Sequence, residues 1–209
     1  MRRIAAFLSA ILCAGLLSAA GQPVPRGRAV YGADQDAALD KISAYLNSIH
    51  SLKSTFVQLG PQGQLDQGEF YLEKPGRLRF SYEPPNPTLI VATGGRVYVK
   101  NARLNTVDHY DIDDTPLGLL LNSDVDLKNN RAVTGIDIQS DALIVHARTS
   151  NNRQQGNITL VFSPPPDIEL RQWTVRDNQG GTTTVALHGL ATGVALDDSL
   201  FVKPVKSPQ

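Results

Sequence analysis

The sequence predicts a mainly β protein built on one long antiparallel sheet. The clearest pattern is GEFYLEKPGRLRFSYEPP at residues 68–85, where apolar side chains alternate with polar ones and only Tyr71 departs from the alternation. Strict alternation is typical of a strand with one buried and one exposed face. Pro75-Gly76 turns the chain between two such runs, and the parity is kept across the turn. The stretch therefore predicts a β-hairpin with one apolar face.

Strand-like segments continue over most of the remaining chain. Turns rich in Gly or Pro separate many of them, and the spacing leaves no room for the crossover helices that parallel strands need. We therefore expect an antiparallel meander of about eleven strands. The predicted strands are 54–60, 66–73, 77–83, 88–93, 96–101, 105–111, 132–138, 142–149, 156–163, 168–177 and 181–190.

A first helix is predicted before the sheet, beginning near Asp34. It is amphipathic and about four turns long, because apolar residues recur at helical spacing while polar ones occupy the other faces. Asp34 or Asp36 can cap its start. Its apolar positions are Leu39, Ile42, Leu46 and Ile49.

A second, short helix is predicted over 115–121. Thr115 stands at a cap position and Pro116 at the first helical position, which proline tolerates best. Leu117, Leu119, Leu120 and Leu121 make this helix strongly apolar. Near the end of the chain, residues 196–204 predict a helical turn that leads into a short extended piece.

The N-terminus is predicted to be a secretory signal peptide at residues 1–20. Arg2 and Arg3 precede an apolar core at residues 4–17, and small residues allow cleavage near Ala20. The apolar stretch is too short for a lasting membrane span. We therefore expect an exported protein with a flexible leader at 21–33 and a single domain at 34–209.

The composition of the predicted mature chain excludes several classes of protein. The single cysteine, Cys13, lies in the signal peptide, so the mature chain can hold no disulfide and no Cys metal site. Removing Arg2 and Arg3 leaves 18 basic and 20 acidic residues. A nearly neutral chain gives no electrostatic reason to expect binding to nucleic acid or to an anionic membrane.

Catalytic motifs are not found in the sequence. The four histidines are scattered, and no nucleophile elbow, zinc-protease motif or phosphate loop is present. The best candidate is DHYDIDD at 108–114, whose carboxylates and imidazole could hold a divalent cation. The same run is typical of a solvated turn before a helix, and we favour that interpretation. We expect no enzyme and no metal.

The apolar face of the sheet leaves two alternatives open on sequence physics alone. A closed barrel would bury this face on itself, whereas an open curved sheet would leave an apolar concavity suited to a ligand. The same residue types form an ordinary core or a cavity. The Leu-rich helix at 115–121 can likewise be a core helix or a movable lid.

Taken together, the motifs resemble the periplasmic outer-membrane lipoprotein carriers, the LolA family. The resemblance covers about residues 36–204 in the family's order. It includes the Thr-Pro that opens the Leu-rich helix and the closing LDDSLFVKP. The three runs that carry it are STFVQ (54–58), GEFYLEKPGRLRFSYEPP (68–85) and LIVATGGRVYVKNARLNTV (89–107).

The resemblance implies an open, unclosed antiparallel β-barrel with a helical lid inside its concave face. It implies a monomeric periplasmic carrier, without cofactor, that ferries the acyl chains of lipoproteins from the inner to the outer membrane. An inner-membrane ATP-driven releasing complex would supply the lipoprotein cargo, and an outer-membrane lipoprotein receptor would accept it. The alternative is a related half-barrel that binds lipids or glycolipids or senses envelope stress.

The resemblance also implies which residues form the site. Lys74 stands where the family usually has an arginine that holds the closed lid through backbone carbonyls, and lysine lacks the planar fork of arginine. The acyl-chain cavity is expected to be lined by Leu46, Ile49, Phe70, Leu72, Leu78, Phe80, Tyr82, Leu117 and Leu120.

Overall fold

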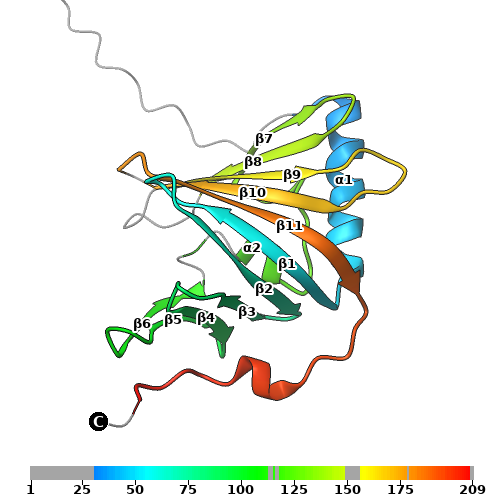
Figure 1. Ribbon diagram of the computed structural model, residues 1–209. Helices are drawn as coiled ribbons and strands as arrows, with labels where there is room; N and C mark the ends of the chain where they lie inside the picture. The colour runs from blue at the N-terminus through cyan, green and yellow to red at the C-terminus, as the bar shows by residue number, and fades with distance from the viewer. Residues whose placement is uncertain (1–30, 113–114, 116–117, 149–155, 178, 208–209) are drawn as a thin grey trace, which may run out of the picture.

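The structure is a computed structural model that describes residues 31–112, 115, 118–148, 156–177 and 179–207. Eleven strands form one antiparallel sheet in the order β6-β5-β4-β3-β2-β1-β11-β10-β9-β8-β7 (Figure 1). The edge strands β6 and β7 are not neighbours in this order, so the sheet is open. This confirms the predicted mainly β class and the open form that the resemblance implied. The strands are β1 Ser51–Leu59, β2 Leu65–Glu73, β3 Arg77–Tyr82, β4 Thr88–Thr93, β5 Arg96–Asn101, β6 Thr106–Asp111, β7 Val133–Ile138, β8 Leu143–Arg148, β9 Asn157–Phe162, β10 Leu170–Arg176 and β11 Thr182–Thr192.

All eleven predicted strands are found, and their bounds differ from the predicted ones by at most three residues. The largest difference is at β1, which begins at Ser51 rather than residue 54. Strand β1 pairs with β2 along its whole length, from Ser51 opposite Glu73 to Leu59 opposite Leu65. The strand begins early because Leu52 already faces the core while Lys53 faces water.

The first helix, α1, spans Ala33–Ser48 and lies along the β7–β10 part of the sheet (Figure 1). The predicted aspartate cap is wrong: Gly32 is the N-cap, and Asp34 and Asp36 lie in the first turn. The helix begins one residue before Asp34, and the two carboxylates instead face the positive end of the helix dipole.

The predicted flexible leader at 21–33 is too long at its C-terminal end. Tyr31 packs against the core, and its hydroxyl donates to the carbonyl of Val133 at 3.4 Å. Ala33 already belongs to α1. Residues 31–33 are therefore part of the folded domain, whereas the predicted signal peptide and residues 21–30 lie outside the described residues.

The second helix, α2, spans Gly118–Leu121 and does not include the predicted first residue, Thr115. The hydroxyl of Thr115 donates to the carbonyl of Ile112 at 2.7 Å, so this side chain belongs to the preceding turn rather than to a helix cap. Pro116 and Leu117 lie outside the described residues. Within the described ranges, no helix combines the length and apolarity needed to cross a bilayer.

The C-terminal segment covers the convex face of β3 and β4 (Figure 1). A 3-10 helix at Asp198–Phe201, here η2, confirms the predicted helical turn, and Val202 after it has an extended backbone. Arg77 pairs with Asp198 at 2.6 Å, and Arg79 donates to the carbonyl of Leu200 at 3.0 Å. The side chain of Phe201 is thereby buried outside the main core, which lies between the concave face and the two helices.

Candidate functional site

The concave face of the sheet is a continuous apolar surface. On this face Leu52 lies opposite Leu72, and Leu72 lies opposite Leu78. All three side chains are buried. The apolar residues that alternate along 68–85 therefore do lie together on one buried face of the sheet. Tyr71 points to the convex side, where its hydroxyl donates to Glu69 at 2.8 Å, and this explains the one exception to the pattern.

An aromatic cluster fills the concave face beside these leucines. The ring centroids of Phe70 and Phe80 are 4.7 Å apart, those of Phe56 and Phe80 are 5.1 Å apart, and Trp173 lies 5.9 Å from Phe70. Gly68 makes this packing possible, because a Cβ there would lie 2.0 Å from the carbonyl oxygen of Ser81 and 3.0 Å from the Phe56 ring. Edge-to-face and tilted contacts of this kind are favourable for aromatic rings.

A cavity separates this face from the two helices. The lining is apolar except for one lysine, and the space open to the centre of a water molecule is about 10 Å³. That is room for about one water, whereas pockets for sizeable ligands measure roughly 300–1,000 Å³. The helices are therefore closed onto the sheet. The lining residues are Leu46, Ile49, Leu52, Phe70, Leu72, Lys74, Leu120, Leu170 and Leu187.

Most of the predicted site residues meet at this cavity. Leu78, Phe80 and Tyr82 share its face but do not line it. They lie in or against the adjoining packed core, where burial raises the pKa of Tyr82 to about 12 and its hydroxyl donates to Gln58 at 2.7 Å. Leu117 lies outside the described residues. The predicted residues that line the cavity are Leu46, Ile49, Phe70, Leu72, Leu120 and Lys74.

The sequence reasoning missed three lining residues, Leu52, Leu170 and Leu187. Leu52 precedes the predicted start of its strand. Leu170 and Leu187 lie within predicted strands, but their approach to α1 and α2 depends on the pairing of β1 with β11. The apolar alternation of β11 was the available signal, and it does not say which earlier strand lies beside it.

The side chain of Lys74 forms its hydrogen bond with α1. Its Nζ donates to the carbonyl of Leu46 at 2.7 Å, near the C-terminus of α1, where a cation is favoured by the helix dipole. Burial lowers the pKa of Lys74 to about 8. The resemblance implied a contact with the lid. In the structure, the neighbouring Gly76 contacts α2, because its N–H donates to the carbonyl of Leu121 at 3.0 Å. The β2–β3 turn therefore bonds to both helices.

Helix α1 is also bonded to the segment that follows α2. The side-chain amide of Asn47 donates to the carbonyl of Val125 at 3.0 Å and accepts from its N–H at 2.8 Å. The hydroxyl of Ser43 accepts from the N–H of Leu127 at 3.1 Å. These contacts hold the chain just after α2 against α1. They do not involve α2, whose position depends on the packing of its own side chains.

The acidic run at 108–114 does not form a cluster where it is described. Asp108 and His109 are neighbours on β6 and therefore point to opposite faces of the sheet. Asp111 lies 3.7 Å from Arg96, and Asp113 and Asp114 are outside the described residues. Among the described residues, no three His, Cys, Asp or Glu side chains are grouped to hold a metal ion.

The fold and the site define a class of protein: an open antiparallel half-barrel with an apolar cavity closed by helices. The chain belongs to the outer membrane lipoprotein carrier protein LolA family, whose sequence profile matches residues 47–203.

The chain is also similar to individual proteins. The chain is 26% identical to an outer-membrane lipoprotein carrier protein of Methylococcus capsulatus over 170 residues, which cover 77% of this chain and 80% of that protein. It is 25% identical to the one of Idiomarina loihiensis over 182 residues, covering 83% and 86%. Among solved structures, a LolA superfamily protein from Nitrosomonas europaea matches with a TM-score of 0.43 and 7% identity, covering 81% of this chain and 98% of that chain.

Proposed function

We propose that this protein is a periplasmic carrier that binds the acyl chains of lipoproteins in the cavity beneath α1 and α2. The observation that carries the proposal is an almost wholly apolar cavity under helices, in a chain of the lipoprotein carrier family. The family supports the class of cargo, and the lining chemistry supports acyl chains as the part that is bound. Nothing in the proposal needs a cofactor or a catalytic step.

The energetics of acyl chains explain why such a carrier needs a closed cavity. Each methylene taken out of water contributes about 0.8 kcal/mol, so one long chain represents on the order of 10 kcal/mol. A cavity with room for about one water cannot hold such a chain until α2 moves away from the sheet. We propose that cargo enters by this movement and that Leu78, Phe80, Tyr82 and Leu117 then join the lining. Lys74 would hold the β2–β3 turn against α1 through Leu46, and Gly76 of the same turn would hold α2 in the closed state through Leu121.

The proposed route follows from the family. A signal peptide at residues 1–20 would direct export, and the mature protein would act as a monomer. An inner-membrane ATP-driven releasing complex would load the lipoprotein, and an outer-membrane receptor would take it. The concave face could serve both steps, because the same movement of α2 exposes the acyl chains to either partner.

A release assay tests the proposal. The purified protein is added to spheroplasts that make a labelled outer-membrane lipoprotein, and we expect label in the supernatant as a one-to-one complex. The Leu120→Glu variant puts a charge into the cavity and should lose release. Leu104→Glu makes the same change at a side chain that is 68% exposed and should keep it. Circular dichroism checks that both variants fold.

Two outcomes contradict the proposal. One is a folded wild-type protein that releases no lipoprotein, and the other is equal release by Leu120→Glu and Leu104→Glu. Capture of free phospholipid without lipoprotein would instead favour the lipid-binding alternative.

A further inference from the structure

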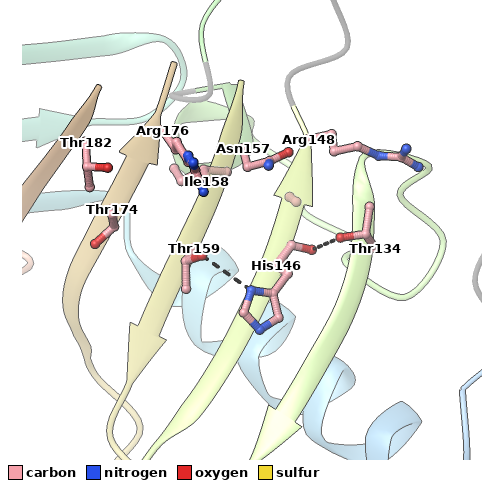
Figure 2. A pocket seen from close by; sticks show the side chains of 10 residues that line it. Thr134, His146, Arg148, Asn157, Ile158, Thr159, Thr174, Arg176 and Thr182 are labelled. Atoms are coloured by element: carbon pink, nitrogen blue, oxygen red, sulfur yellow. Dashed lines mark hydrogen bonds between the residues drawn. The ribbon is translucent and has the colours of Figure 1, made fainter. Parts of the chain in front are cut away.

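A second hollow lies on the opposite, convex face of the sheet, over β7 to β11 (Figure 2). Its volume is about 570 Å³. The side chains of β8 alternate here, with Val145 and Ala147 buried in the core and His146 and Arg148 on the other face. This hollow, here called the convex groove, is therefore separated from the cavity beneath α1 and α2 by the thickness of the sheet. A ligand in the groove does not compete with a ligand in the cavity.

The floor of the groove is a row of polar side chains that satisfy one another. His146, Thr159, Thr174 and Thr184 lie opposite each other across four strands. The hydroxyls of Thr174 and Thr184 are 2.9 Å apart. Figure 2 shows the contact between His146 and Thr159, in which Nδ1 lies 3.3 Å from the hydroxyl. The other ring nitrogen of His146 lies 2.9 Å from Asp137. This row is a rigid polar surface with its hydrogen bonds already made.

The next row along the strands carries two arginines with spare donors. Arg148 and Arg176 lie on either side of Asn157, in register with it. Two strand spacings place their backbones about 10 Å apart. Both side chains are exposed, and neither guanidinium makes a hydrogen bond or ion pair within the described part of the chain. Figure 2 shows the Arg148 side chain extending away from Asn157.

The carboxylates beside the groove already have partners: Asp137 lies 2.9 Å from His146. None of the residues that line the groove is acidic. The carboxylate next to Arg176, Asp177, accepts hydrogen bonds from the N–H groups of Gln179 at 2.9 Å and Gly181 at 2.7 Å, so it is engaged by its own turn. Two guanidinium groups with free donors favour carboxylates, which they bind through paired hydrogen bonds.

We propose that this convex groove is a docking site for an acidic segment of a partner protein, with Arg148 and Arg176 each binding a carboxylate. The separation of the arginines suits two carboxylates on one chain better than a single inorganic anion. A peptide segment can enter the hollow, whereas the headgroups of a bilayer form a plane that cannot. The shape therefore favours a peptide segment over a membrane surface. Because the site is on the face opposite the acyl cavity, the partner can bind whether or not the cavity is filled, and the proposal does not depend on the proposed cargo.

The test is a titration of ¹⁵N-labelled protein with hexaglutamate, followed by NMR, with hexaglutamine as the uncharged control. We expect shifts at the amides of Asn157, Thr159 and Arg176. The double variant Arg148→Gln/Arg176→Gln should weaken hexaglutamate binding by about 5- to 10-fold, as expected for two exposed ion pairs. A matched variant, Arg96→Gln/Arg103→Gln, loses the same charge on β5 and in the turn that follows it, at the other end of the sheet, and should bind like the wild type.

Three results would overturn the proposal. Equal weakening by both double variants would show a general charge effect. The same shifts with inorganic phosphate at equal concentration would show a site for a single anion. Binding of phosphatidylglycerol vesicles through the two arginines, without binding of hexaglutamate, would assign the groove to a membrane surface.

Discussion

Helices α1 and α2 cover the same cavity but are held in different ways. Helix α1 has 16 residues, and its side chains reach the sheet: Gln35 donates to the carbonyl of Ile136 at 3.1 Å, and Tyr45 accepts from the N–H of Leu170 at 3.0 Å. Helix α2 has four residues and three buried leucines. In the described part of the chain, its bond to the sheet is the one from Gly76 to Leu121.

This difference assigns the two helices different mechanical roles. A helix of a single turn has no stability of its own, because nucleation is unfavourable and is not repaid by further hydrogen bonds. The closed position of α2 therefore depends on the packing of its leucines. We infer that α1 belongs to the scaffold and that α2 leaves the sheet by local opening, at a lower free energy than global unfolding.

The largest expected effect comes from breaking the attachment of α1. The Asn47→Leu variant leaves both backbone polar groups of Val125 without partners, and we expect the free energy of unfolding to fall by about 2 kcal/mol. Urea denaturation measures this. Asn129→Leu makes the same change at an exposed side chain, where the lost hydrogen bond to the Asp126 carboxylate can be replaced by water, and should cost less than about 0.5 kcal/mol. Similar losses in both variants would contradict the scaffold role of α1.

A change confined to α2 should have a smaller and opposite effect. Gly118 begins α2, its φ lies outside the left-handed region, and a Cβ there would meet open space. Gly118→Ala should therefore stabilise the helix by about 0.5–1 kcal/mol. Hydrogen exchange should slow about 2- to 5-fold at the amide of Asn122, which bonds to the carbonyl of Gly118 at 3.2 Å. Equal slowing in α1 would show that the two helices open together.

The third expected effect is a pH dependence of stability that arises from the contact between Lys74 and α1. Burial lowers the pKa of Lys74 to about 8 from the ordinary 10.5, so the unfolded chain binds this proton more tightly than the folded one. Between pH 8 and 10.5, stability attributable to Lys74 should rise with pH. Urea denaturation of the wild type and of Lys74→Met at pH 7 and pH 10 should show the wild type gaining relative to the variant. A constant or falling difference would contradict this.

Local patterns were enough to predict the strands and the position of the first helix. The alternation around Phe70 and Phe80 and the turn at Gly76 depend only on near neighbours in the chain. The edges of the cavity depend on pairings between distant strands. Leu187 reaches the site because β11 pairs with β1, with Phe56 opposite Leu187. No local pattern contains that pairing.

The contacts of the β2–β3 turn could not be predicted for a related reason. The sequence shows a lysine and a proline before a turn, and a family pattern points to a lid. Which helix receives Lys74 depends on how far α1 extends toward His50, whose carbonyl accepts from the N–H of Lys74 at 2.8 Å. The start of the second helix was predicted one turn too early at Thr115, because a Thr-Pro pair is typical of a helix start whereas the Thr115 hydroxyl bonds back to Ile112 in the preceding turn.

The order of the strands has a consequence for how the half-barrel could widen. The two edge strands, β6 and β7, are consecutive in the chain, and the segment between them, residues 112–132, contains α2. Any separation of the edges therefore lengthens the path that this segment must span. Val125 and Leu127, after α2, are bonded to α1. A long ligand that moves β6 away from α1 would therefore pull on α2 through the covalent chain, so that widening of the mouth is coupled to displacement of the helix that covers the ligand.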